Sequence, residues 1–151
     1  MNINDDFTEI MSYAHCWNWL PDWVVVQKIY QAFPDSYSVL SPFAFAYMEE
    51  LIRSTTSEYG IEIFDESGKP KKRKVGIKLI KFAIEENKTC NQELVSLLEK
   101  IKSYYRYSQS TDRGDNRNSV AHGYMHPKFW TKVSFEGLVH DIAALSKHAG
   151  F

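Results

Sequence analysis

The segment from Arg117 to Tyr124, RNSVAHGY, contains three residue types that together suit the cleavage of RNA. An arginine presents a planar fork of donors that fits phosphate oxygens and stabilises charge building up on phosphorus. A histidine accepts or donates a proton near neutral pH, and an asparagine orients its neighbours through its carboxamide. Because the 2′-hydroxyl of RNA is itself the nucleophile, Arg117, Asn118 and His122 would need no metal ion. The expected product ends are a 2′,3′-cyclic phosphate and a 5′-hydroxyl.

The spacing of these residues limits what one copy of the chain can build. On an ideal helix, positions five apart such as Arg117 and His122 point about 140° away from each other. Asn118 and His122 share a face, and so do Arg117 and Tyr124. Either the helix is distorted here or two copies meet across a two-fold axis. We favour the homodimer, because it doubles the basic and proton-transfer groups in one cleft.

These residues also resemble the signature of a known family. The pattern Arg-Asn-x-x-x-His, present from Arg117 to His122, is similar to the motif of HEPN domains. The resemblance implies an all-α bundle of four to six helices, a single HEPN-like domain over residues 1–151, and usually a dimer. It also implies a metal-independent ribonuclease of the kind found in toxin–antitoxin, phage-defence and CRISPR systems. Arg117 and His122 would then be catalytic, with Asn118 in support.

The resemblance nominates an acidic residue as well. In such domains an earlier helix often carries an acidic residue about one turn before an arginine. The segment from Ala46 to Arg53, AYMEELIR, looks similar and nominates Glu49 as a further catalytic residue, with Glu50 second. The alternative for Glu49 is a surface pair with Arg53, four positions later on the same helix.

Tyr124 extends the pattern to Arg-Asn-x-x-x-His-x-Tyr. This longer pattern resembles the toxins that are paired with minimal nucleotidyltransferases, in which the partner adenylylates the tyrosine. The resemblance implies a regulatory role for Tyr124 and a nucleotidyltransferase-type antitoxin as partner. A charged nucleotide beside the site would block RNA by repulsion and bulk.

A dense basic run follows Pro70 and comprises Lys71, Lys72, Arg73 and Lys74. The default interpretation is a solvated loop. The sharper hypothesis is that these four residues bind the RNA backbone near the active site. We expect single-stranded RNA, whose bases and 2′-hydroxyls are accessible.

The composition bounds the class of protein. The chain has 151 residues, a formal net charge of −1, 44% hydrophobic and 25% charged residues, which is typical of one globular domain. Cys16 and Cys90 follow no disulfide or metal motif. The first residues are acidic and polar, unlike a signal peptide, and no apolar run approaches the roughly 20 residues of a membrane span. We therefore expect a cytoplasmic protein without membrane contact.

Apolar periodicity and capping residues predict five or six helices with short connections. Residues 60–74 form a polar connection, in which residues 61–64 are a candidate strand. A short helix should run from Arg117 to His122 and end at Gly123. The residues predicted to begin other helices are Asp22, Ser41 with Pro42, Asn91 and Ser134.

Aromatic residues gather in two places. Trp17, Trp19 and Trp23 predict core or dimer-interface packing, with base stacking as the weaker alternative. Tyr105 and Tyr107 lie near the end of a long helix, and we expect Tyr105 in the core.

His122 and His126 are four apart, a spacing that suits zinc on a helix. Gly123 and Pro127 interrupt such a helix, so we expect no metal ion and no cofactor.

Two other functions stay open. The first is a catalytically silent HEPN module that dimerises or binds RNA or a nucleotide, because fold does not imply activity. The second is an interaction protein in which the pairing of Arg117 with His122 is incidental.

Overall fold

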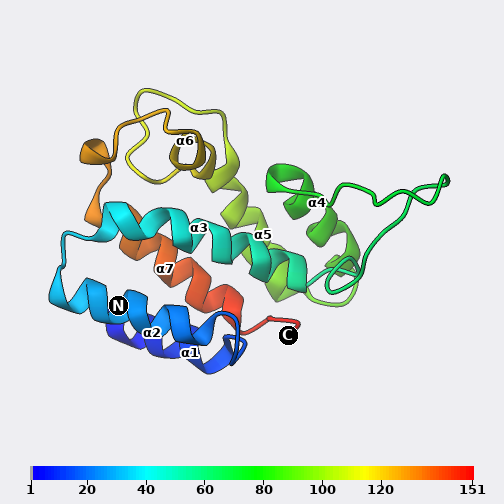
Figure 1. Ribbon diagram of the computed structural model, residues 1–151, viewed down its shortest axis with the longest axis horizontal. Coiled ribbons are helices and arrows are strands. Elements are labelled where there is room, and N and C mark those ends of the chain that lie inside the picture. The colour runs from blue at the N-terminus through cyan, green and yellow to red at the C-terminus, as the bar shows by residue number, and fades with distance from the viewer. Residues whose placement is uncertain (1) are drawn as a thin grey trace.

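The computed structural model describes residues 2–151, and the described residues form seven α-helices and two short 3-10 helices (Figure 1). The all-α class is confirmed. The expected four to six helices were too few, because the described residues form seven separate α-helices. The elements are α1 (Ile3–Tyr13), α2 (Leu20–Ala32), α3 (Tyr37–Ser54), α4 (Gly76–Asn87), α5 (Gln92–Ile101), η1 (Lys102–Tyr105), α6 (Arg117–His122), η2 (Pro127–Phe129) and α7 (Lys132–Ser146).

α3 and α7 lie side by side at the centre of the molecule (Figure 1). α1 packs on α7 and α2 on α1, which covers one side of this central pair. On the other side, α4 and α6 contact α3, while α5 contacts α4 and α7. The short α6 therefore rests on the central helix α3 and on η1.

Three predicted helix starts were wrong. α2 begins at Leu20, so that Pro21 lies in its first turn, where a missing N–H costs nothing, and Asp22 follows inside the helix. α3 begins at Tyr37, and Pro42 lies within it. Pro42 is exposed and the next turn is buried, so tertiary packing stabilises a helix that continues past the proline. α7 begins at Lys132, because the hydroxyl of Thr131 accepts the backbone N–H of Ser134 at 3.2 Å.

Two predicted boundaries were right. The side chain of Asn91 caps α5 by accepting the backbone N–H of Leu94 at 3.0 Å. Gly123 ends α6 in the left-handed conformation, at φ 62°.

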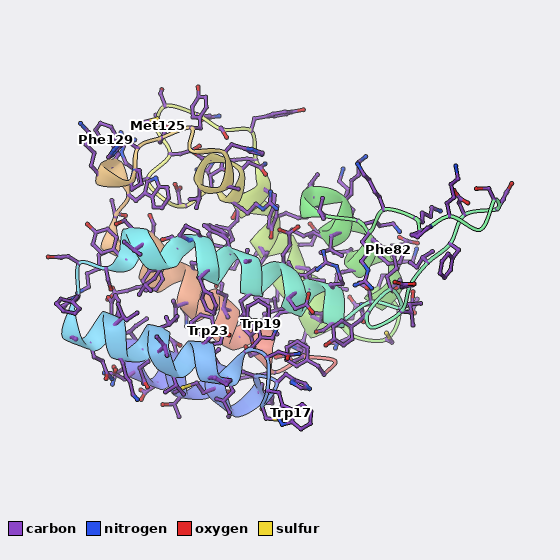
Figure 2. All side chains as sticks on the ribbon, in the orientation of Figure 1. Trp17, Trp19, Trp23, Phe82, Met125 and Phe129 are labelled. Atoms are coloured by element: carbon purple, nitrogen blue, oxygen red, sulfur yellow. The ribbon has the colours of Figure 1, made fainter. Side chains whose placement is uncertain are left out.

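The core centres on an aromatic cluster between α1, α2, α3 and α7. The ring of Trp23 is 0% exposed and lies 5.2 Å from that of Tyr47 and 6.1 Å from that of Phe7. Trp19 also packs on Tyr47, at 5.0 Å. In contrast, Trp17 is 85% exposed and points away from the helices (Figure 2). The expectation of core packing therefore holds for two of the three tryptophans.

Residues 61–75 project from the body as an extended arm (Figure 1). The backbone N–H of Lys71 donates to the carbonyl of Ile63, and that of Asp65 donates to Lys69. Within residues 2–151 the β-structure is limited to one antiparallel bridge, between Phe64 and Pro70. None of the described helices has the length and apolar character needed to cross a membrane.

Candidate active site around Arg117

The position of α6 is set by the residue that precedes it. Asn116 is fully buried, and its side-chain oxygen accepts the backbone N–H groups of Asn118 at 2.9 Å and Ser119 at 3.4 Å. This N-cap satisfies donors that the first turn of a helix leaves free. The motif residues from Arg117 onward therefore start from a fixed backbone.

Asn116 is itself held by a buried polar network. The carboxylate of Asp112 accepts from the Nδ2 of Asn116 at 3.1 Å, from Arg106 at 2.7 Å and from the backbone of Gln109 at 2.8 Å. Arg106 also pairs with Asp115 at 2.9 Å. We name Arg106, Asp112, Asp115 and Asn116 the α6 frame. An asparagine immediately before the motif was the available signal, since it is a preferred N-cap residue.

The contacts of Asp115 within and beside the α6 frame affect the charge of its carboxyl group. Partial burial opposes ionisation, but hydrogen bonds from the backbone N–H groups of Arg113 and of Asp115 itself, together with the pair with Arg106, hold the pKa of Asp115 below its usual value. The carboxylate is therefore stabilised in its charged form.

Arg117 forms an ion pair with the residue nominated on α3. Its Nε and Nη2 donate to Oε2 of Glu49 at 3.1 and 2.7 Å. Glu49 is only 8% exposed, and its Oε1 accepts the backbone N–H of Gly76 at 2.6 Å. The carboxylate therefore joins α3, the start of α4 and α6 at one point. The alternative pair of Glu49 with Arg53 was wrong, because Arg53 pairs with Glu50 instead, at 3.1 Å.

Asn118 turns its carboxamide toward the chain that precedes α6. Its Nδ2 donates to the carbonyl of Arg106 at 3.1 Å and lies 3.5 Å from that of Tyr105. Its Oδ1 lies 3.5 Å from Nη1 of Arg117. Asn118 thus anchors α6 to the end of η1, and within residues 2–151 it forms no hydrogen bond with His122.

His122 and Tyr124 lie at the opposite end of α6. Both are exposed, Tyr124 by 56%, and neither side chain forms a hydrogen bond within residues 2–151. α6 is α-helical from Arg117 to His122, so Arg117 and His122 lie about 7.5 Å apart along the helix axis. Within one copy, the structure brings Arg117 together with Glu49 and leaves His122 facing outward.

Two cavities flank the pair Arg117–Asn118. One, of about 170 Å³, opens between α3 and α6 and has Arg117 and Glu49 in its wall. Its other lining residues are Pro42, Phe45, Ala46, Val120 and Ala121. The second cavity, of about 400 Å³, lies on the side of Asn118 and is lined by Ile77, Lys81, Tyr105, Arg106, Tyr107 and Asn118.

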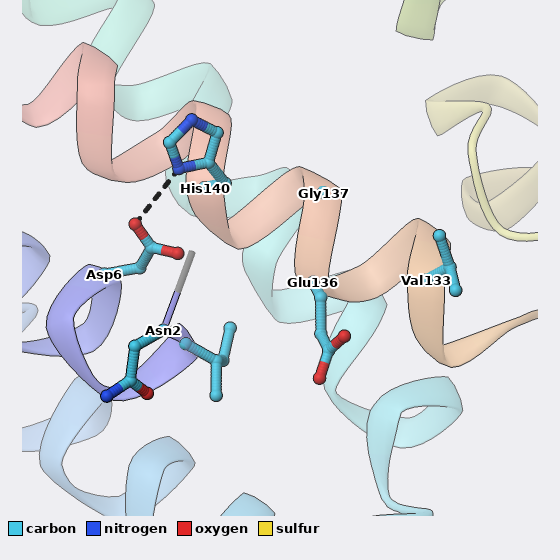
Figure 3. A pocket seen from close by; sticks show the side chains of 7 residues that line it. Asn2, Asp6, Val133, Glu136, Gly137 and His140 are labelled. Carbon is cyan, nitrogen blue, oxygen red and sulfur yellow. Dashed lines mark hydrogen bonds and ion pairs between the residues drawn. The ribbon is translucent and has the colours of Figure 1, made fainter.

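A third cavity, of about 410 Å³, lies away from the motif between α1 and α7. Here Nδ1 of His140 lies 3.1 Å from Oδ1 of Asp6, and Asn2, Val133 and Glu136 line the space (Figure 3). The polar residues of this cavity belong to the packing of α1 on α7, and none comes from the motif.

The basic run divides into two parts. Lys71, Lys72 and Arg73 are exposed on the projecting arm, whereas Lys74 pairs with Glu58 and lies 4.0 Å from the ring of Phe82. None of the four lines a cavity beside Arg117. The arm is tied to the site through Gly76, which follows it and donates to Glu49.

His126, the partner considered for a zinc pair, caps η2 instead. Its Nδ1 accepts the backbone N–H of Lys128 at 3.1 Å. Among residues 2–151, no group of three or more His, Cys, Asp or Glu side chains is placed to hold a metal ion.

Comparisons of the chain with models of protein families, with curated proteins and with solved structures find no match. The candidate site therefore rests on its own geometry.

Proposed function

We propose that the chain is a metal-independent endoribonuclease that cleaves single-stranded RNA and acts as a toxin or phage-defence effector. The observation that carries the proposal is the ion pair between the buried Glu49 and Arg117 at a cavity, with an unpartnered histidine on the same short helix. Residues 117–122 are connected to one another only by their sequence pattern. The pair with Glu49 adds a fourth nominated residue from 68 positions away.

In this proposal Arg117 binds the scissile phosphate with the donors that Glu49 leaves available. Glu49 accepts from Nε and Nη2, and Oδ1 of Asn118 lies 3.5 Å from Nη1, so one proton of Nη1 and one of Nη2 remain for phosphate oxygens. Glu49 acts as a positioning residue, since a buried carboxylate holds the guanidinium plane in one orientation. Asn118 holds α6 against η1 and thereby supports Arg117.

His122 transfers the protons. One imidazole removes the proton of the 2′-hydroxyl, whose oxygen then attacks phosphorus and forms the 2′,3′-cyclic phosphate. The bond from phosphorus to the 5′-oxygen breaks, and that oxygen takes a proton from a second, protonated imidazole. Because Arg117 and His122 diverge on α6, we place the complete site between two copies of the chain.

Tyr124 provides the regulatory element of the proposal. Its side chain is 56% exposed, two residues after His122, and is accessible to a nucleotidyltransferase-type antitoxin. Adenylylation there would add a negative charge and bulk beside the proton-transfer group.

The first experiment incubates purified protein with end-labelled single-stranded RNA in EDTA. We expect wild type to leave 2′,3′-cyclic phosphate ends, and Arg117→Ala and His122→Ala to leave the RNA intact. His126→Ala is the matched control, because it removes another exposed histidine from the same region and should retain cleavage. Cleavage that persists in both site variants would contradict the assignment.

Mixing the two inactive variants tests the composite site. A heterodimer of Arg117→Ala with His122→Ala keeps one intact arginine and one intact histidine, on different copies, and water replaces the missing second imidazole as the proton donor at a reduced rate. Recovery of part of the cleavage supports a site shared between subunits. If the mixture stays inactive while size-exclusion chromatography shows dimers, that arrangement is wrong.

A second function is favoured by one specific observation. Glu49 occupies two of the three nitrogens of the Arg117 guanidinium, which also suits a purely structural arginine in a silent RNA-binding or dimerisation module. A folded dimer that binds RNA but cleaves none would support this module, provided that intact mass shows no modification of Tyr124.

A further inference from the structure

The second cavity beside the motif has the composition of a nucleobase subsite. It measures about 400 Å³, within the range of about 300–1,000 Å³ of small-ligand sites. Three segments build it: α4 supplies Ile77 and Lys81, the end of η1 and its continuation supply two tyrosines with Arg106, and α6 supplies Asn118. Oδ1 of Asn118 lies 3.5 Å from Nη1 of Arg117, so one wall of the cavity adjoins the guanidinium that the proposed function places on the phosphate.

Tyr107 is the most unusual residue of this cavity. Its side chain is 93% exposed, although an aromatic ring gains by leaving water. Its backbone is held firmly, because its carbonyl accepts the Nδ2 of the buried Asn116 at 3.3 Å. The α6 frame therefore holds at the cavity a tyrosine that packs on no other aromatic ring and on no cation within residues 2–151. The buried ring of Tyr105 and the side chain of Ile77 add apolar surface inside it.

The two cationic side chains of the cavity differ in whether their charge is available to a ligand. The guanidinium of Arg106 is neutralised by Asp112 and Asp115. Lys81 is exposed and forms no ion pair within residues 2–151, so its ammonium is available to an anion. An aromatic face beside an available cation is the combination with which proteins hold single-stranded nucleic acid.

We propose that this cavity binds one base of the RNA strand next to the scissile phosphate, with the base stacked on Tyr107 and an adjacent phosphate on Lys81. The inference rests on the proposed function, because it places RNA at Arg117. It assigns the cavity a role that neither the motif nor the basic arm supplies.

The test measures binding of fluorescein-labelled, 2′-O-methylated single-stranded RNA by anisotropy, in EDTA. The methylated strand lacks the nucleophile, so binding is measured without cleavage. We expect Tyr107→Ala to weaken binding about tenfold, which corresponds to the loss of one stacked base. Tyr107→Phe should bind as wild type does. Tyr13→Ala is the matched control, since Tyr13 is an exposed tyrosine on α1, away from the motif.

Abasic substitutions locate the base itself. In wild type, removal of the base at one position of the strand should weaken binding about tenfold. In Tyr107→Ala the same removal should have no further effect, because the stacking partner is already gone. Equal affinity of wild type and Tyr107→Ala, or equal abasic effects in both, would overturn the proposal.

Lys81→Gln tests the phosphate contact. We expect the negative slope of log affinity against log salt to become shallower by about 0.7, the value for one phosphate of a single strand. Lys78→Gln, an exposed lysine on the same helix outside the cavity lining, should leave the slope unchanged. An identical slope in Lys81→Gln and wild type would remove this contact.

The outcomes separate this inference from the proposed function. RNA cleavage by wild type, with unchanged binding in Tyr107→Ala, would reject the subsite alone. Binding that depends on Tyr107, without cleavage of unmodified RNA, would reject the ribonuclease and keep the subsite in a silent module. Absence of both RNA binding and cleavage would reject both.

Discussion

The aromatic cluster between α1, α2, α3 and α7 and the two buried residues of the α6 frame, Asp112 and Asn116, are held by different interactions. Trp23 and Phe7 are fully buried among other apolar rings. Asp112 and Asn116 are buried to the same degree, yet each is surrounded by hydrogen-bond partners. The scaffold is thus stabilised by apolar burial, and the motif helix by a polar network.

The difference matters because a substitution lowers the stability of the two regions for different reasons. Apolar packing loses stability in proportion to the volume removed. A buried polar network loses stability for another reason: when one partner is removed, the remaining groups stay desolvated and unsatisfied. We therefore expect changes in the cluster to affect the whole fold, and changes in the frame to affect residues 106–124 first.

The largest effect is expected for Trp23→Ala, which removes the central ring of the aromatic cluster. The free energy of unfolding should fall by about 3–5 kcal/mol. Urea unfolding followed by circular dichroism measures it. Trp17→Ala is the control, since that ring is exposed, and should stay within about 0.5 kcal/mol of wild type. Similar losses in the two variants would show that Trp23 is not the centre of the core.

Asp112→Ala should have the next largest effect, about 1–3 kcal/mol, because Arg106, Asn116 and the backbone of Gln109 lose their shared acceptor. Hydrogen exchange should rise in residues 106–124 before it rises in α3 or α7. The exposed Asp22→Ala serves as control. Uniform exchange throughout the chain would mean that the frame and the cluster unfold as one unit.

Asp115→Asn should have a smaller effect that depends on pH. The lowered pKa of Asp115 means that its carboxylate stabilises the fold above the ordinary value near 4, and that this contribution disappears as pH falls through the lower folded pKa. The variant should lose about 0.5–1 kcal/mol at pH 7, after allowance for solvent screening. Below pH 4 the two proteins should converge.

Unfolding in urea at pH 7 and at pH 3 measures this convergence. Asp35→Asn is the control, because Asp35 is exposed and forms no ion pair within the part of the chain that the structure describes. A difference between wild type and Asp115→Asn that persists unchanged at pH 3 would show that the charge of the Asp115 carboxylate is not its source.

His122→Ala should have the smallest effect on stability, within about 0.5 kcal/mol, because the side chain is exposed and lacks a hydrogen-bond partner in residues 2–151. Arg117→Ala should lose about 1–3 kcal/mol, since it leaves the carboxylate of Glu49 buried and short of a partner. Urea unfolding of both variants at pH 7 gives the comparison. A loss above 1 kcal/mol in His122→Ala would make His122 a structural residue.

The sequence by itself determined the features that depend on neighbours along the chain. The all-α class, the cap at Asn91 and the short helix that ends at Gly123 follow from periodicity and from the conformations that single residues prefer. The helix starts predicted at Asp22 and at Ser41 with Pro42 were misplaced, because a proline is compatible both with the first turn of a helix and with a helix interior that tertiary packing stabilises.

The tertiary structure alone decided which groups meet. Arg53 is closer to Glu49 along the chain, but α6 packs on α3, and the carboxylate of Glu49 therefore pairs with Arg117. The burial of Asp112 and the exposure of Tyr107 were decided in the same way. The reason is physical: local propensity fixes the course of each helix, whereas the partner of a side chain depends on helix orientations, which only the packing of the whole core sets.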